Sequence, residues 1–268
     1  MSFQESYRDQ LFTVTDPDSR LRDPNNLMAF LRWKAGDAIP NGKAVGDFKT
    51  IPVSTIVSVP EIAFQAISSK SRAVFARVND ANSGVEIGWT STVNFKDRFR
   101  NVTLGKQEPA AGAGQYAETA VWIKGHYKGQ VPLILIMDRT REIERLTEPT
   151  AVPYLKMIKA AKADGVSLYL NSGFRTYGEQ KYLYEGYKAG KAGFNKAAKP
   201  GTSNHQNGIA VDISVSGGTG SPQYDWLAKN GTSFGFIRTV TGEPWHWEYL
   251  NTLAAKAKAK GVHRSWDL

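Results

Sequence analysis

The stretch SNHQNGIAVD, residues 203–212, decides how the later part of this chain folds. Within it, Asn207-Gly208 is a strong turn signal. Side chains alternate along a strand, so an uninterrupted strand would send His205 and Asp212 to opposite faces. A turn between them resets this alternation. We therefore expect His205 to fold back towards Asp212.

The segment after the predicted turn reads as a buried strand with one unusual position. Alternate residues from Ile209 to Ile213 would form a core face. Small Ala210 would lie beside Asp212 on the other face. Burying a lone carboxylate in such an apolar strand is costly unless it is paired. A cation removes that cost, so Asp212 is a candidate metal ligand.

A second segment, EPWH at residues 243–246, supplies another histidine and another carboxylate. Pro244 disfavours helical geometry at Glu243, so this is not the helical zinc motif with two histidines. We expect an extended segment in which His246 and Glu248 face the same way. The kink at Pro244 can place Glu243 beside a metal as a general base rather than as a ligand.

Together the two segments offer two imidazoles, one carboxylate ligand and one further carboxylate. A catalytic zinc site needs three protein ligands, an open position for water and a base beside it. Each segment alone has an ordinary interpretation, because a buried histidine often donates to a carbonyl and Trp-His-Trp can be core packing. Their occurrence in one chain favours a metal site formed by His205, Asp212 and His246.

The pattern SxHxxGxAxD at 203–212, followed by ExWH at 243–246, resembles the zinc D-alanyl-D-alanine carboxypeptidase family (VanY-like). Relatives of that family include VanX-type dipeptidases and phage L-alanyl-D-glutamate endopeptidases. The resemblance extends upstream to SGFRT at 172–176, with Gln180 behind it, and covers roughly residues 140 to 268. Phenylalanine and threonine replace the tyrosine and serine of the family's upstream segment, which puts no chemistry in doubt.

The resemblance implies a role for each matching residue. The zinc ligands would be His205, Asp212 and His246, and Glu243 would be the catalytic base. Arg175 would polarise the scissile carbonyl and stabilise its oxyanion, because a guanidinium stays charged and offers several donors. The alternative for Arg175 is a surface salt bridge. Substrate contacts are expected from Arg175, Gln180, Ser203 and Trp245, although Gln180 and Ser203 can instead cap and orient.

Composition narrows the remaining classes of protein. The 268 residues carry a net charge of +9 and no cysteine, which excludes disulfides, thiolate zinc sites and a cysteine nucleophile. The basic residues are spread along the chain, which favours an anionic bacterial envelope over nucleic acid as the partner. The longest apolar run, 131–137, is strand-sized, so we expect no integral membrane segment. Residues 1–6 are polar and show no secretory signal.

The pattern of predicted secondary structure changes near residue 140. We expect residues 1–138 to form a small, mostly-β domain and 139–268 to form an α+β zinc peptidase domain with a small antiparallel sheet and flanking helices. Through AVGDF at 44–48, IP at 51–52 and GW at 88–89, the first domain loosely resembles bacterial Src-homology-3-like wall-binding modules. Its aromatic residues, such as Trp33 and Trp89, would either contact peptidoglycan or fill the barrel core.

The sequence therefore predicts a zinc peptidase that cuts peptidoglycan stem peptides, of the D-Ala-D-Ala carboxypeptidase type. The first alternative is an endopeptidase acting as a phage endolysin or an injected antibacterial effector, which would bring a delivery or immunity partner. The second is a non-catalytic wall-binding protein with a structural metal, and the third is a basic nucleic-acid binder. The predicted place of action is the periplasm or cell wall, reached by phage-type release, injection or a removed signal.

Overall fold

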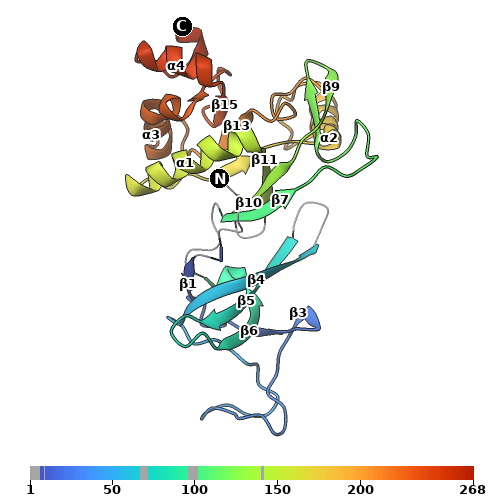
Figure 1. Ribbon diagram of the computed structural model, residues 1–268, viewed down its shortest axis with the longest axis vertical. Helices are drawn as coiled ribbons and strands as arrows, with labels where there is room; N and C mark the ends of the chain where they lie inside the picture. The colour runs from blue at the N-terminus through green and yellow to red at the C-terminus, as the bar shows by residue number, and fades with distance from the viewer. Residues whose placement is uncertain (1–6, 9, 67–71, 96–101, 140–141) are drawn as a thin grey trace. The chain divides into compact units, whose positions relative to one another are not determined.

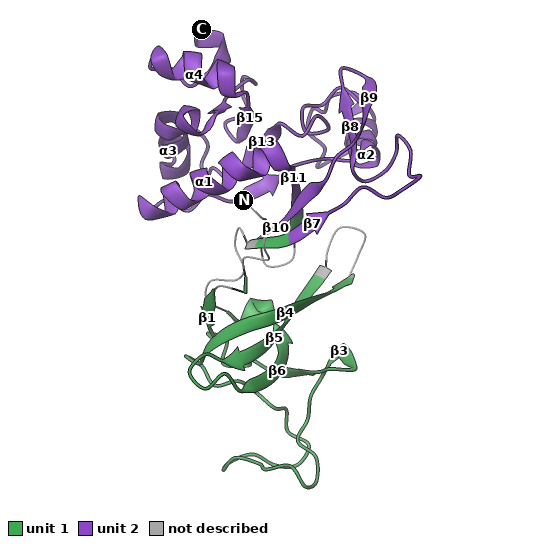
Figure 2. Ribbon diagram, in the orientation of Figure 1, with its two compact units in different colours: residues 1–104, 137–143 green, residues 105–136, 144–268 purple. Residues whose placement is uncertain are grey.

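The computed structural model describes all residues except 1–6, 9, 67–71, 96–101 and 140–141. The polar N-terminus therefore lies outside the described residues. The chain forms two compact units, one of residues 1–104 with 137–143 and one of residues 105–136 with 144–268 (Figure 2). Residues 105–136 thus group with the later part of the chain, whereas the sequence suggested a division after residue 138. The assignment of separate functions to 1–138 and 139–268 stays a prediction.

The described strands of the first unit form a six-stranded sheet in the order β1-β4-β5-β6-β2-β3 (Figure 1). Neighbouring strands run antiparallel. Buried apolar side chains of this sheet include Phe12, Val57, Phe75 and Val78. The Src-homology-3-like interpretation of this sheet stays a prediction. Its elements are β1 Leu11–Thr13, β2 Leu21–Asp23, β3 Asn26–Phe30, β4 Ile56–Ala66, β5 Arg72–Asp80, β6 Glu86–Ser91 and the 3-10 turn η1 Thr92–Asn94.

The second unit mixes strands and helices. A four-stranded antiparallel sheet has the order β12-β13-β15-β14, and β8 pairs with β9 as a hairpin. The predicted α+β class, with a small antiparallel sheet and flanking helices, is confirmed for this region. Its strands are β8 Ala120–Ile123, β9 His126–Gln130, β12 Leu170–Ser172, β13 Ala210–Ile213, β14 Phe236–Ile237 and β15 His246–Tyr249. Its helices are α1 Glu148–Ala163, α2 Tyr177–Lys188, α3 Pro222–Asn230, α4 Asn251–Ala259 and the 3-10 turns η2 Gly231–Phe234 and η3 Ser265–Asp267.

Three further strands contain the points where the chain passes from one unit to the other. They are β7 Val102–Gln107, β10 Leu133–Arg139 and β11 Glu142–Thr147, and they form a sheet in the order β11-β10-β7.

Local sequence explains where the helices of the second unit begin and end. Helix α1 buries Tyr154, Met157, Ile158 and Ala161, whose spacing of three or four residues makes one apolar face. It ends before Gly165, whose φ of +78° suits a residue without a β-carbon. Helix α2 starts at a capping box, in which Thr176 accepts from the Glu179 amide while the Glu179 carboxylate accepts from the Thr176 amide.

The four-stranded sheet sets the register of the candidate site. Strand β13 is fully buried, and it lies between β12 and β15. In this register Asp212 stands opposite His246 on one side and Ser172 on the other. Residues that are 34 positions apart along the chain, Asp212 and His246, thereby become cross-strand neighbours.

Candidate metal centre

His205 lies in the turn that the sequence predicted before β13. The Gly208 amide donates to the His205 carbonyl (3.2 Å), and Gly208 has a φ of +77°. A β-carbon at Gly208 would lie 2.2 Å from Cγ2 of Thr147, so only glycine fits. The hydroxyls of Thr147 and Thr150 donate to the Gly208 carbonyl at 2.8 and 2.7 Å. The turn is therefore fixed from outside as well as by its own backbone.

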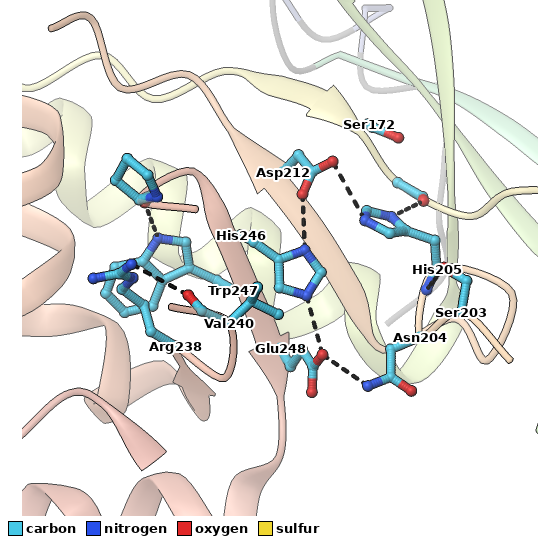
Figure 3. A network of polar contacts seen from close by, with 12 residues as sticks. Ser172, Ser203, Asn204, His205, Asp212, Arg238, Val240, His246, Trp247 and Glu248 are labelled. Carbon is cyan, nitrogen blue, oxygen red and sulfur yellow. Dashed lines mark hydrogen bonds and ion pairs between the residues drawn. The ribbon is translucent and has the colours of Figure 1, made fainter. Parts of the chain in front are cut away.

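This turn brings His205, Asp212 and His246 together (Figure 3). Nε2 of His205 lies 3.3 Å from Oδ2 of Asp212, and Nδ1 of His246 lies 3.0 Å from Oδ1 of the same carboxylate. All three side chains are buried, and one ligand atom from each lies within 4.8 Å of the others. The residues predicted as metal ligands thus converge, and the group could hold a metal ion.

The outer nitrogen of each imidazole has an acceptor of its own. Nδ1 of His205 donates to the Gly173 carbonyl (2.7 Å), and Nε2 of His246 lies 3.0 Å from Oε1 of Glu248. A metal-binding histidine typically donates its second ring N–H to a carbonyl or carboxylate, which fixes the ring and its tautomer. These contacts leave Nε2 of His205 and Nδ1 of His246, which face Asp212, as the nitrogen atoms that could bind a metal.

Glu248 belongs to this arrangement although the sequence analysis gave it no role. Its carboxylate is buried and accepts a hydrogen bond from the Asn204 side chain (2.7 Å) as well as facing His246. The sequence signal was the alternation along β15, which put His246 and Glu248 on one face. Asn204 had no such signal, because its pairing with Glu248 spans 44 residues.

The electrostatics of the group follow from burial and from its partners. Burial raises the pKa of Asp212, but His205, His246 and Arg175 outweigh it and hold that pKa far below its usual range. Burial lowers the pKa of His246, but Asp212 and Glu248 raise it to about 9. Burial is the main cause of the lowered pKa of His205. Asp212 therefore stays ionised, as a metal ligand must.

Arg175 joins the same network. Its guanidinium donates to Oδ2 of Asp212 (2.9 Å), to Oγ of Ser172 (3.0 Å) and to Oε1 of Gln180 at the limiting distance of 3.5 Å. Gln180 is buried, and its amide also donates to the Ala198 carbonyl (2.8 Å). The structure thus brings Arg175 and Gln180 to the predicted ligands. The salt bridge of Arg175 is with Asp212 and is largely buried, unlike the surface pair considered as its alternative.

The side chains of three other predicted site residues, Ser203, Trp245 and Glu243, make no contact of this kind with the two imidazoles or the Asp212 carboxylate among the described residues. Oγ of Ser203 accepts from the His205 amide (3.3 Å), which is a capping contact. Trp245 is 37% exposed, and within the described residues it has no hydrogen bond to the histidines or Asp212. The Glu243 carbonyl accepts from the His246 amide (3.1 Å). Its carboxylate makes no hydrogen bond or ion pair with any residue that the structure describes.

Among the described residues, no helix combines the length and the apolar character that crossing a membrane requires.

Comparison with known proteins identifies the region that carries this group. Residues 143–252 match the family model of VanY, D-alanyl-D-alanine carboxypeptidase, which confirms the resemblance predicted from the sequence. A D-alanyl-D-alanine carboxypeptidase of Enterococcus faecalis (strain ATCC 700802 / V583) is 37% identical over 144 residues, which are 42% of this chain and 54% of that protein. One of Enterococcus faecium is 30% identical over 118 residues, 39% of this chain and 37% of that protein. The chain thus spans about half or less of the length of these relatives.

Two solved structures are similar in part. A mutant of the vancomycin resistance D,D-pentapeptidase VanY in complex with Zn(II) is 30% identical, with a TM-score of 0.43, and the match covers 55% of this chain and 92% of that one. VanYB in complex with D-alanine-D-alanine is 28% identical, also with a TM-score of 0.43, and the match covers 56% of this chain and 96% of that one.

Proposed function

We propose that this chain, whose residues 143–252 form a VanY-family domain, is a zinc-dependent peptidase that removes D-alanine from peptidoglycan stem peptides. The observation that carries the proposal is the convergence of His205, Asp212 and His246, each buried and each held from outside. The family match supports the same activity. Because peptidoglycan lies outside the cytoplasm, the enzyme would act in the periplasm or cell wall.

The donor set fits zinc better than the other common divalent ions. Two imidazole nitrogens and one carboxylate oxygen are typical ligands of catalytic zinc, whereas magnesium and calcium prefer oxygen alone. His205, Asp212 and His246 would hold the ion. When bound, zinc would supply a Lewis acid that lowers the pKa of water to about 7 and polarises a carbonyl oxygen.

The chain's own residues would supply the proton transfers and the charge stabilisation. Glu243 is three positions before His246 in the turn leading to β15, and its carboxylate is not engaged by any described residue. In our proposal it takes a proton from the attacking water and returns it to the leaving amine. Arg175, held beside Asp212, would stabilise the negative charge that develops on the scissile carbonyl oxygen.

The other residues predicted to contact substrate differ in whether their polar atoms are already hydrogen-bonded within the protein. The Gln180 side chain donates a hydrogen bond to the Ala198 carbonyl and accepts one from Arg175. The Ser203 hydroxyl oxygen accepts a hydrogen bond from the His205 amide. Both would therefore orient the site rather than recognise substrate. Trp245 has exposed ring surface and would contact the substrate directly.

Digestion of purified muropeptides, analysed by mass spectrometry, tests the proposed activity. We expect the zinc-loaded protein to remove one terminal alanine from pentapeptide stems. Separation of cross-linked dimers or release of whole stems would instead indicate an endopeptidase, as in a phage endolysin or an injected effector.

Glu243→Ala separates an enzyme from a wall-binding protein with a structural metal. The variant should fold and keep zinc but lose activity by about 10²- to 10⁴-fold, the usual contribution of a general base. Glu185→Ala, which removes an exposed carboxylate of α2, is the matched control and should keep the parental rate. Parental activity in Glu243→Ala would show that another group is the base.

A further inference from the structure

The hairpin β8–β9 lies outside residues 143–252, which match the family model, yet backbone hydrogen bonds join it to the loop that carries His205. The Trp122 amide donates to the Gln206 carbonyl (3.1 Å), and the Gly125 amide donates to the Gly201 carbonyl (2.8 Å). A β-carbon at Gly201 would lie 3.2 Å from the Trp122 ring, so the contact is close. The hairpin is therefore fixed to the loop that carries His205, although it lies outside the residues that match the family model.

The same hairpin contacts the chain on both sides of Arg175. On its inner face, Val121 packs with Leu133 and Phe174, the residue before Arg175. On its outer face, the ring of Trp122 lies 4.7 Å from that of Tyr177, two residues after Arg175. Strand β8, which Figure 2 draws next to α2, thus contacts the first residue of that helix through Trp122.

Four aromatic side chains gather at this point, and we call them the aromatic platform: Tyr116, Trp122, Tyr127 and Tyr177. Tyr116 is stacked on Trp122 (6.2 Å between centroids, 22° between planes) and lies 5.1 Å from Tyr177. Tyr127 lies 5.9 Å from Trp122. Trp122 is buried, but Tyr116 is 65% exposed and Tyr127 is 37% exposed. The platform thus has a buried base and an exposed tyrosine surface.

The loop that carries Tyr116 is held in place by hydrogen bonds. Nε1 of Trp122 donates to the Gln115 carbonyl (3.0 Å), and the Gln130 amide donates to the Ala113 carbonyl (2.7 Å). Gln130 in turn accepts from the Thr119 hydroxyl (2.7 Å). An ordered tyrosine loses little conformational freedom on binding, so it is an effective contact residue.

From this arrangement we infer that the aromatic platform binds a pyranose ring of the glycan strand to which the stem peptide is attached. The inference rests on the proposed function, which supplies the peptidoglycan substrate. A tyrosine offers a flat apolar face with a hydroxyl at its rim. A pyranose presents an apolar C–H face rimmed by hydroxyls, whereas the alanine and acidic residues of a stem offer no comparable surface. The platform therefore selects substrates that still carry their sugar.

The test compares a disaccharide-pentapeptide with the same pentapeptide without sugar, using the zinc-loaded full chain. We expect the parent to have the higher kcat/KM on the disaccharide form. Tyr116→Ala should lower kcat/KM on that form by roughly five- to tenfold, as expected for one aromatic contact, and should leave the free peptide within about twofold. Tyr116→Phe, which keeps the ring, should behave like the parent. Tyr187→Ala, an exposed tyrosine of α2 outside the platform, should change neither rate.

A binding measurement keeps this inference separate from the peptidase proposal. The Kd of a disaccharide-tripeptide, which lacks terminal D-Ala-D-Ala, should also rise roughly five- to tenfold in Tyr116→Ala even if the protein releases no alanine. An equal loss on both substrates, or no preference for sugar in the parent, would overturn the inference. So would a loss that depends on the free amine of the stem's diamino acid, tested by N-acetylating it, because the ring would then bind a cation.

Discussion

Charged side chains are used in opposite ways in the two units. Around β13, Asp212 is buried and faces two histidines and an arginine. In the N-terminal unit, the guanidinium groups of exposed Arg32 and partly exposed Arg20 lie over the ring of Phe48, at 4.0 and 4.4 Å from its centroid. Such contacts leave the charge near water and cost little, whereas a buried charge is destabilising without its partners. Buried, mutually dependent charges therefore mark the candidate site, and exposed cation–π contacts do not.

We expect the largest difference between the two units in the free energy of unfolding that is lost when one carboxylate is removed from each. In chelator-treated protein, Asp212→Asn should lower the free energy of unfolding by about 3 kcal/mol, because Arg175 and His246 lose a buried partner. Asp18→Asn, which removes the exposed partner of Arg20, should cost about 0.5 kcal/mol or less. Urea titration measures both. Equal effects would remove the distinction between the two units.

Zinc affinity should depend on Glu248 through its contact with His246. Glu248→Gln keeps the size of the side chain but removes the charge that holds the Nε2–H of His246. We expect zinc to bind about 10- to 100-fold more weakly, measured by competition with a chromophoric chelator. The control Glu185→Gln alters an exposed carboxylate of α2 and should leave affinity unchanged. An unchanged affinity in Glu248→Gln would show that the ring is oriented by other contacts.

The pH dependence of the metal-free protein tests the same buried charges. Asp212 and Glu248 raise the pKa of His246 to about 9 despite its burial, above the ordinary value of about 6.5. A raised pKa contributes stability that is complete below about pH 6.5 and is lost as the pH rises through about 9. Urea midpoints at several pH values should fall across this window. His246→Gln should flatten the profile, and a flat profile in the parent would contradict the assignment.

The smallest effect at the site should come from the N-terminal unit. Trp33→Ala should leave zinc content unchanged and alanine release from soluble peptides within about twofold, since Trp33 belongs to the unit that carries none of the candidate ligands. If residues 1–138 target the wall, the same variant should be retained less on sedimented peptidoglycan. A lowered zinc content would show that the units are coupled.

The sequence predicted that His205, Asp212 and His246 come together because its signals are local. Asn207-Gly208 predicted the turn, and alternation in the next strand predicted the burial of Asp212. The pairing of Asn204 with Glu248 was missed because it depends on the register of β13 and β15. The contacts of the hairpin β8–β9 with Gln206 and Phe174 were missed because they join residues that are far apart along the chain. The roles of Glu243 and Arg175 stay predictions.

The zinc content of the purified protein tests the central claim most directly. We expect one equivalent of zinc per chain in the parent and in Glu243→Ala, and none after dialysis in His205→Ala or His246→Ala. One equivalent retained by either histidine variant, or none bound by the parent, would contradict the assignment of His205, Asp212 and His246 as a metal centre.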